Sequence, residues 1–166
     1  MFELKRLPPD SVEVAIEKAE RYRLLNEPRQ AESICLDVLE VVSGEQRALT
    51  ILLLARTDQF KHSKGAGVED ARALLPRFQD EYSRLYYAGI ICERWAKATL
   101  TNNRMGCGPI VYQWLREAMS YYEAAEKLRR PGNDDPLLRW NSCARAINTH
   151  EHVAPAPDKD FHPLLE

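Results

Sequence analysis

Apolar residues recur every three or four positions along almost the whole chain, and this pattern constrains the fold more than any other feature. The segment 29–42 is the clearest example, because its apolar residues all fall on one face of a helix. No segment alternates apolar and polar residues as a strand would. The sequence therefore predicts an all-α fold. The helices are expected at residues 11–26, 29–42, 45–60, 84–100 and 110–130, with a last one from 135 to about 149.

Prolines and polar residues mark where these helices begin and end. Pro28 suits the first turn of the second helix, and Asp135-Pro136 opens the last one in the same way. Ser43 and Gln46 have the spacing of a capping box for the third helix. A further helical stripe runs from 71 to 82, and Pro76 is expected to kink or break it.

Composition and charge narrow the range of environments and partners. The chain has 166 residues and a net charge of -2 with 23 Lys plus Arg against 25 Asp plus Glu, so it lacks the cationic excess typical of nucleic-acid binding. It has no apolar run of about 20 residues and no apolar stretch near its start, so we expect a cytoplasmic protein without a membrane partner. The four cysteines form no C-x-x-C pair and are expected to be free thiols, Cys107 being the one that could be exposed.

The chain divides into three parts by its patterning. Residues 1–10 form an N-terminal extension, residues 11–149 carry the helical pattern, and residues 150–166 form a proline-rich tail without periodicity.

Two clusters of small and aromatic residues suggest that the helix pairs repeat. In the first pair, Ala19 is followed by Tyr22 and then by Ala31, with Pro28 between the helices. Small residues at these positions allow two helix axes to approach to about 8 Å.

The second cluster consists of Ala118, Tyr122 and Ala125, with Pro131 just beyond the helix end. This order of small and aromatic residues resembles the tetratricopeptide repeat, whose 34-residue period carries Ala19 to Leu53 in the third helix. The resemblance implies antiparallel helix-turn-helix repeats over residues 11–149, stacked as a short right-handed solenoid of about three helix pairs plus a closing helix. Other helical solenoids, and an Ala-rich bundle with this spacing by chance, are the alternatives. The segment 61–109 departs from the pattern.

The resemblance also implies a role, because repeats of this kind bind a peptide or helix of a partner protein in a concave groove lined by the first helix of each pair. Arginine offers a planar fork to a carboxylate, asparagine can bond an extended backbone, and Tyr or Trp adds contact area. The alternative for each residue is a solvated surface position. The residues expected to line the groove are Arg23, Arg47, Tyr86, Arg94, Trp140, Asn141 and Asn148.

Signals for catalysis or metal binding are weak. His150-Glu151-His152 supplies two imidazoles but no fixed set of three or four ligands, and the segment 64–67 lacks the strand and the G-K-[ST] ending of a phosphate-binding loop. We therefore predict a non-enzymatic interaction module with no catalytic residues, metal site or cofactor. The alternatives are a self-associating scaffold, in which copies of the chain form a homo-oligomer, and a helical-bundle enzyme or metal-binding protein.

Overall fold

The structure, a computed structural model, describes residues 2–62, 65, 67–102 and 106–156, and helices without any strand make up the regular secondary structure of this part of the chain. The prediction of an all-α fold is confirmed. The long helices are α1 (Val12–Leu24), α2 (Pro28–Val41), α3 (Gln46–Asp58), α5 (Glu81–Thr101), α6 (Gly108–Leu128) and α7 (Asp135–Thr149). The short helix α4 (Val68–Arg72) and two 3-10 turns, η1 (Pro9–Ser11) and η2 (Leu75–Arg77), complete the set.

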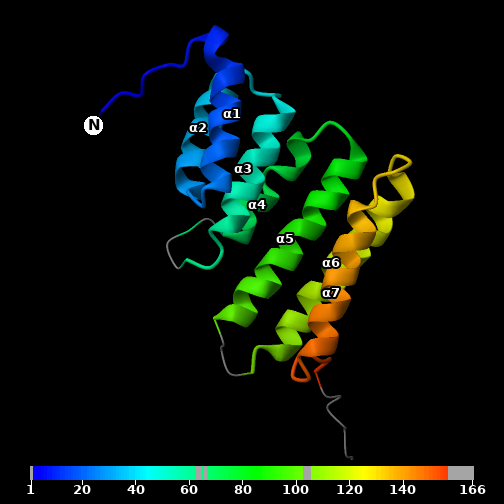
Figure 1. Ribbon diagram of the computed structural model, residues 1–166. Helices are drawn as coiled ribbons and strands as arrows, with labels where there is room; N and C mark the ends of the chain where they lie inside the picture. Colours follow the sequence, from blue (N-terminus) through cyan, green and yellow to red (C-terminus); the bar gives the residue numbers. More distant parts are fainter. Residues whose placement is uncertain (1, 63–64, 66, 103–105, 157–166) are drawn as a thin grey trace, which may run out of the picture.

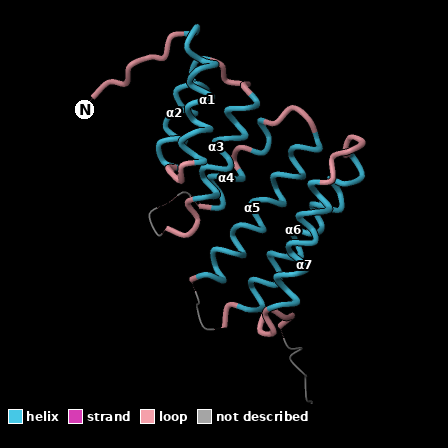
Figure 2. The backbone as a smooth tube through the Cα atoms, in the orientation of Figure 1, coloured by secondary structure: helices cyan, strands magenta, loops and turns pink. Residues whose placement is uncertain are grey.

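The helices α1, α3, α5 and α7 lie side by side in chain order and run in the same direction, while α2 and α6 pass behind them (Figure 1). Within α1, α2 and α3, and again within α5, α6 and α7, successive helices are antiparallel neighbours joined by short loops, whereas α3 and α5 run in the same direction (Figure 2). The largest interfaces join α1 to α2, α2 to α3, α5 to α6 and α6 to α7. We call the surface formed by α1, α3, α5 and α7 the front face.

Two clusters of buried residues form the core. The first joins α1, α2, α3 and α4, and the second joins α6 and α7. Helix α5 contributes to both, because Ile90 and Ile91 pack into the first cluster whereas Cys92 and Ala96 pack into the second. Helix α5 therefore contributes directly to both halves of the core, and Trp114 of α6 also packs against the first cluster.

The spacing of the helices is regular in the first half of the chain. Helix α3 begins and ends 34 residues after α1 does, and α5 begins 35 residues after α3. The segment between α3 and α5 differs from the segment between α1 and α3. It contains the short helix α4 and the turn η2 in place of one helix as long as α2. The stripe predicted at 71–82 is interrupted, in agreement with the break expected at Pro76. Pro76 lies in the first turn of η2, where its missing N–H costs no helical hydrogen bond.

One further local expectation is corrected, and the open question of whether Cys107 is exposed is answered. Glu45, not Ser43, caps α3: its carboxylate accepts hydrogen bonds from the backbone N–H groups of Arg47 and Ala48, at 2.9 and 3.2 Å. A glutamate reaches the first-turn N–H groups from this position, so the capping box does not form. Cys107 is buried, because it packs into the second cluster at the start of α6.

Helices α5 and α6 approach closely around one glycine. A Cβ atom added at Gly89 would lie 2.5 Å from Cε1 of Tyr122, so the tyrosine ring packs directly on the α5 backbone. Ala118 and Ala125 flank Tyr122 on α6 and are fully buried. The small-aromatic-small sequence Ala118, Tyr122 and Ala125 thus lies at the α5–α6 interface.

The chain after α7 turns back onto the second cluster. Val153 is 3% exposed, and its N–H donates to the His150 carbonyl at 2.8 Å. Of the predicted tail, residues 150–166, the part from 157 to 166 lies outside the described residues. Among the helices of the described segments, none is both long enough and apolar enough to cross a membrane.

Candidate functional site

Two arginines from different helices share one carboxylate on the front face. Arg23 of α1 and Arg94 of α5 both pair with Asp58 at the end of α3, with N–O distances of 3.0 and 2.5 Å. The side chains of Arg23 and Arg94 are each about four-fifths buried. The three helices α1, α3 and α5 are therefore linked by charge at this level of the front face.

The two arginines are held differently. Arg94 donates through one terminal nitrogen to Asp58, to the Thr57 hydroxyl at 2.7 Å and to the Leu54 carbonyl at 3.2 Å. Its burial lowers its pKa below the ordinary value for arginine. Arg23 Nε is close to the Asp58 carboxylate, but its N–H does not point at an acceptor, so this contact is electrostatic rather than a hydrogen bond.

The residue before Arg94 on α5, Glu93, is a fully buried carboxylate. It accepts a hydrogen bond from the Tyr122 hydroxyl of α6 at 2.6 Å and pairs with Lys97 at 2.5 Å and with Arg139 of α7 at 3.6 Å. Burying a charge is costly unless it is paired and hydrogen-bonded, and these three partners meet that requirement. Glu93 thus joins α5, α6 and α7.

The neighbours of Glu93 respond to its charge. Burial and the adjacent carboxylate raise the pKa of Tyr122, so its phenol stays protonated and continues to donate. Burial alone would lower the pKa of Arg139, but Glu93 and the Tyr86 hydroxyl raise it. Lys97 also donates to the Ser142 hydroxyl of α7 at 2.9 Å, which places its ammonium group between α5 and α7.

Together these side chains form one polar band across all four helices of the front face. We call it the cross-helix strip. Its residues are Arg23, Asp58, Glu93, Arg94, Lys97 and Arg139.

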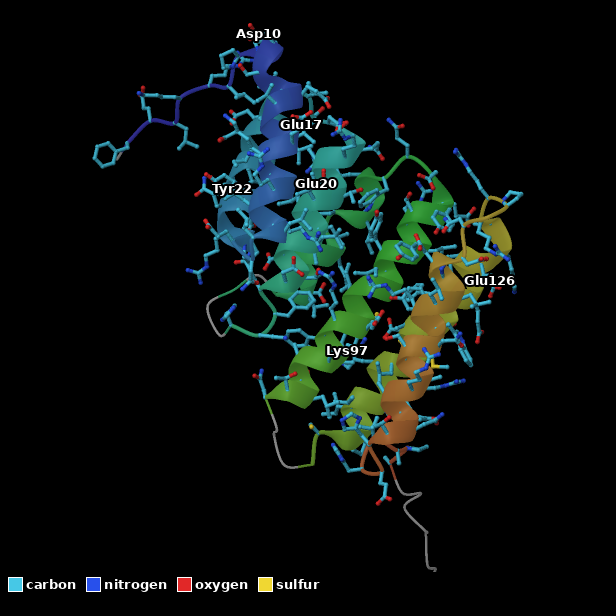
Figure 3. All side chains as sticks on the ribbon, viewed as in Figure 1. Asp10, Glu17, Glu20, Tyr22, Lys97 and Glu126 are labelled. Atoms are coloured by element: carbon cyan, nitrogen blue, oxygen red, sulfur yellow. The ribbon has the colours of Figure 1, made fainter. Side chains whose placement is uncertain are left out.

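The strip carries four cationic and two anionic side chains, and so has an excess of two positive charges on a chain whose net charge is -2. Lys97 and Arg139 are its most accessible cations, with side-chain exposures of 40% and 37%. Figure 3 labels Lys97 on α5, on the side next to α7.

The front face has a second polar region nearer the start of α1. A hollow of about 230 Å³ lies between α1 and α3, with Glu20, Arg47 and Thr50 in its lining. Arg47 also pairs with Glu13, and both side chains are exposed. Glu17 and Glu20 lie on the same part of α1 (Figure 3), so this region is more acidic than the strip.

The predicted groove residues fall into two groups. Arg23, Arg94 and Tyr86 lie at or beside the strip, since Tyr86 neighbours Arg139, and Arg47 lies on the same face nearer the start of α1.

The α7 residues lie elsewhere. The indole of Trp140 donates to Glu123 of α6 at 2.9 Å, so Trp140 faces α6 while Arg139 and Ser142 face α5. Asn141 is half-buried and Asn148 is exposed, and neither belongs to the strip.

Sequence reasoning missed Glu93, Lys97 and Arg139. One signal for Glu93 was available, because it occupies a position between Gly89 and Ala96 on a stripe of otherwise small, buried residues of α5. A glutamate on a buried stripe needs partners from other helices. Nothing local to the sequence identifies Lys97 and Arg139 as those partners.

The remaining candidates of the sequence analysis do not assemble into a site. His150 and His152 meet edge to face at 5.8 Å, but no group of three or more potential metal ligands occurs among the residues that are described. The candidate phosphate loop at 64–67 lies partly outside those residues. No protein-family model, curated protein or solved structure matches this chain.

Proposed function

We propose that this chain is a non-enzymatic protein-interaction module of tetratricopeptide-like architecture, and that its front face binds a peptide or helix of a partner protein. The helices of this face correspond to the first helices of successive repeats, which line the groove in such solenoids. The 34-residue offset between α1 and α3 supports the repeat assignment.

The observation that carries the proposal is the cross-helix strip. Four helices place charged side chains in one continuous band, and several of these are held in fixed positions by ion pairs and hydrogen bonds. Fixed side chains lose little conformational freedom when a partner binds, which favours affinity.

Site-specific photo-crosslinking tests this proposal. A photo-reactive amino acid is placed at Tyr86 and Ser142, half-buried positions beside the strip on the front face, and at Arg29 of α2 and Arg116 of α6 as positions on the helices behind. After irradiation in cell extract, we expect discrete protein adducts from the front positions only. Equal adducts from both sets, or adducts from α2 and α6 alone, would contradict a binding role for the front face.

A further inference from the structure

We infer that the partner segment bound by the front face is acidic, and that its carboxylates contact the cross-helix strip. This inference rests on the proposed function and specifies the chemistry of the partner. It starts from the local charge: the strip has two positive charges in excess, although the whole chain has a net charge of -2. A local field of this sign attracts carboxylates and repels basic segments.

The arginines of the strip retain hydrogen-bonding capacity. A guanidinium carries five N–H donors. All three contacts of Arg94 use the same terminal nitrogen, and Arg139 contacts Glu93 through one terminal nitrogen as well. Arginine binds carboxylates in a bidentate manner through its remaining N–H groups, so the strip can accept acids in addition to its own two.

The two internal acids keep this cationic surface together. Asp58 lies between Arg23 and Arg94, and Glu93 lies between Lys97 and Arg139. Each acid offsets part of the repulsion between the cations around it without neutralising them. The result is two cationic centres, one between α1 and α5 and one between α5 and α7. A segment with more than one carboxylate can contact both.

Other charges on the front face limit where an acidic segment can lie. Glu13, Glu17 and Glu20 of α1 face the region around Arg47, which is their nearest basic residue on α3. Like charges repel, so an acidic segment is excluded from that end and confined to the level of the strip. Charge therefore determines both the class of the partner segment and its place on the face.

The test uses the full chain and three fluorescent peptides of equal length, built from repeats of Glu-Ser, Gln-Ser and Lys-Ser. Binding is measured by fluorescence anisotropy at low and at high salt. We expect the Glu-Ser peptide to bind best and its binding to weaken as salt screens the charges. Equal binding of the Glu-Ser and Gln-Ser peptides would overturn the inference.

Variants locate the binding on the protein. The double variant Lys97→Gln/Arg139→Gln should weaken binding of the Glu-Ser peptide roughly 3- to 10-fold, because two screened charge contacts are lost. The double variant Arg29→Gln/Arg116→Gln removes the same charge from α2 and α6 and should leave binding unchanged. Equal weakening by both double variants would mean that only the net charge matters, which contradicts a site at the strip.

Asp58→Asn should change the affinity for the Glu-Ser peptide in the opposite direction. It frees Arg23 and Arg94 from their shared carboxylate, so it should tighten binding of the Glu-Ser peptide while it lowers the thermal midpoint. A purely structural role for the strip predicts the loss of stability without the gain in affinity. Circular dichroism confirms that each variant is folded.

Two outcomes separate this inference from the proposed function. If photo-crosslinks remain confined to the front face but the Glu-Ser peptide shows no preference, the interaction module stands and the acidic partner is wrong. If a single-stranded oligonucleotide binds the strip more tightly than the Glu-Ser peptide, the ligand is a nucleic acid and the inference is also overturned.

Discussion

At the scale of single residues, Glu93 shows how a charge becomes compatible with a core. Its carboxylate is fully buried, yet both oxygens have partners: Tyr122 on one, and Lys97 and Arg139 on the other. A buried ion pair contributes less to stability than its Coulomb energy suggests, because both charges have lost their hydration. What Glu93 does provide is specificity, since only one arrangement of α5, α6 and α7 satisfies it.

The nearby Gly89 leads to a prediction about the α5–α6 contact. Gly89→Ala would bring a methyl group to 2.5 Å from the buried ring of Tyr122, which cannot move without disturbing its bond to Glu93. Overpacking of this kind costs about 1–3 kcal/mol of unfolding free energy. Urea denaturation measures the loss. The control is Gly44→Ala, where an added Cβ meets nothing within 4 Å and the stability should change by less than about 0.5 kcal/mol. Equal effects at both positions would contradict the close approach.

At the scale of the helices, the start of α3 gives a prediction that distinguishes two possible caps. Glu45→Ala removes the carboxylate that accepts from the N–H groups of Arg47 and Ala48, so the unfolding free energy should fall by about 0.5–2 kcal/mol. Ser43→Ala, at the position that the sequence favoured as the cap, should be nearly neutral. Chemical denaturation of both variants checks this. A larger loss of unfolding free energy for Ser43→Ala than for Glu45→Ala would show that Ser43, and not Glu45, caps α3.

The long helices could be predicted from the sequence because each carries its own evidence: an apolar stripe, and a proline or a polar residue at its start. The region between α3 and α5 lacked such evidence. Its stripe at 71–82 has helical spacing, but a five-residue helix and a 3-10 turn around Pro76 bury the same residues, such as Ala71 and Phe78. Periodicity reports which residues are buried, and it does not distinguish a continuous helix from two short turns.

The candidate site was predictable only in part, for a related reason. Arg23 and Arg94 were predicted from the resemblance to a repeat, and the structure brings both to Asp58 on the front face. The orientation of α7 depends instead on how it packs against α5 and α6, and there Arg139 rather than Trp140 faces the strip. Adjacent positions on a helix point about 100° apart, so a small rotation of α7 changes which side chain reaches the site.

At the scale of the whole molecule, α5 decides how the two halves behave together. The buried residues of α5 divide between the two core clusters. Two further residues of α5 contact the first half: Arg94 bonds to Thr57 of α3, and Trp95 packs against Phe60. Losing the first cluster would therefore uncover one side of α5 and weaken the surface on which α6 packs. We expect the described helices to unfold as a single cooperative unit rather than as two.

A core substitution far from α6 tests this cooperativity. Leu52 of α3 is fully buried in the first cluster, so Leu52→Ala should lower the unfolding free energy by about 2–5 kcal/mol. Trp95 and Trp114 pack against the first cluster, but Trp140 of α7 packs against the second cluster alone, so its fluorescence in a Trp95→Phe/Trp114→Phe background reports on the other half of the molecule. If the halves are coupled, fluorescence and circular dichroism shift to the same lower midpoint. The exposed Leu138→Ala should leave both unchanged. A fluorescence transition that stays in place while the circular dichroism transition splits would show that the two clusters unfold independently, and that α5 does not couple them.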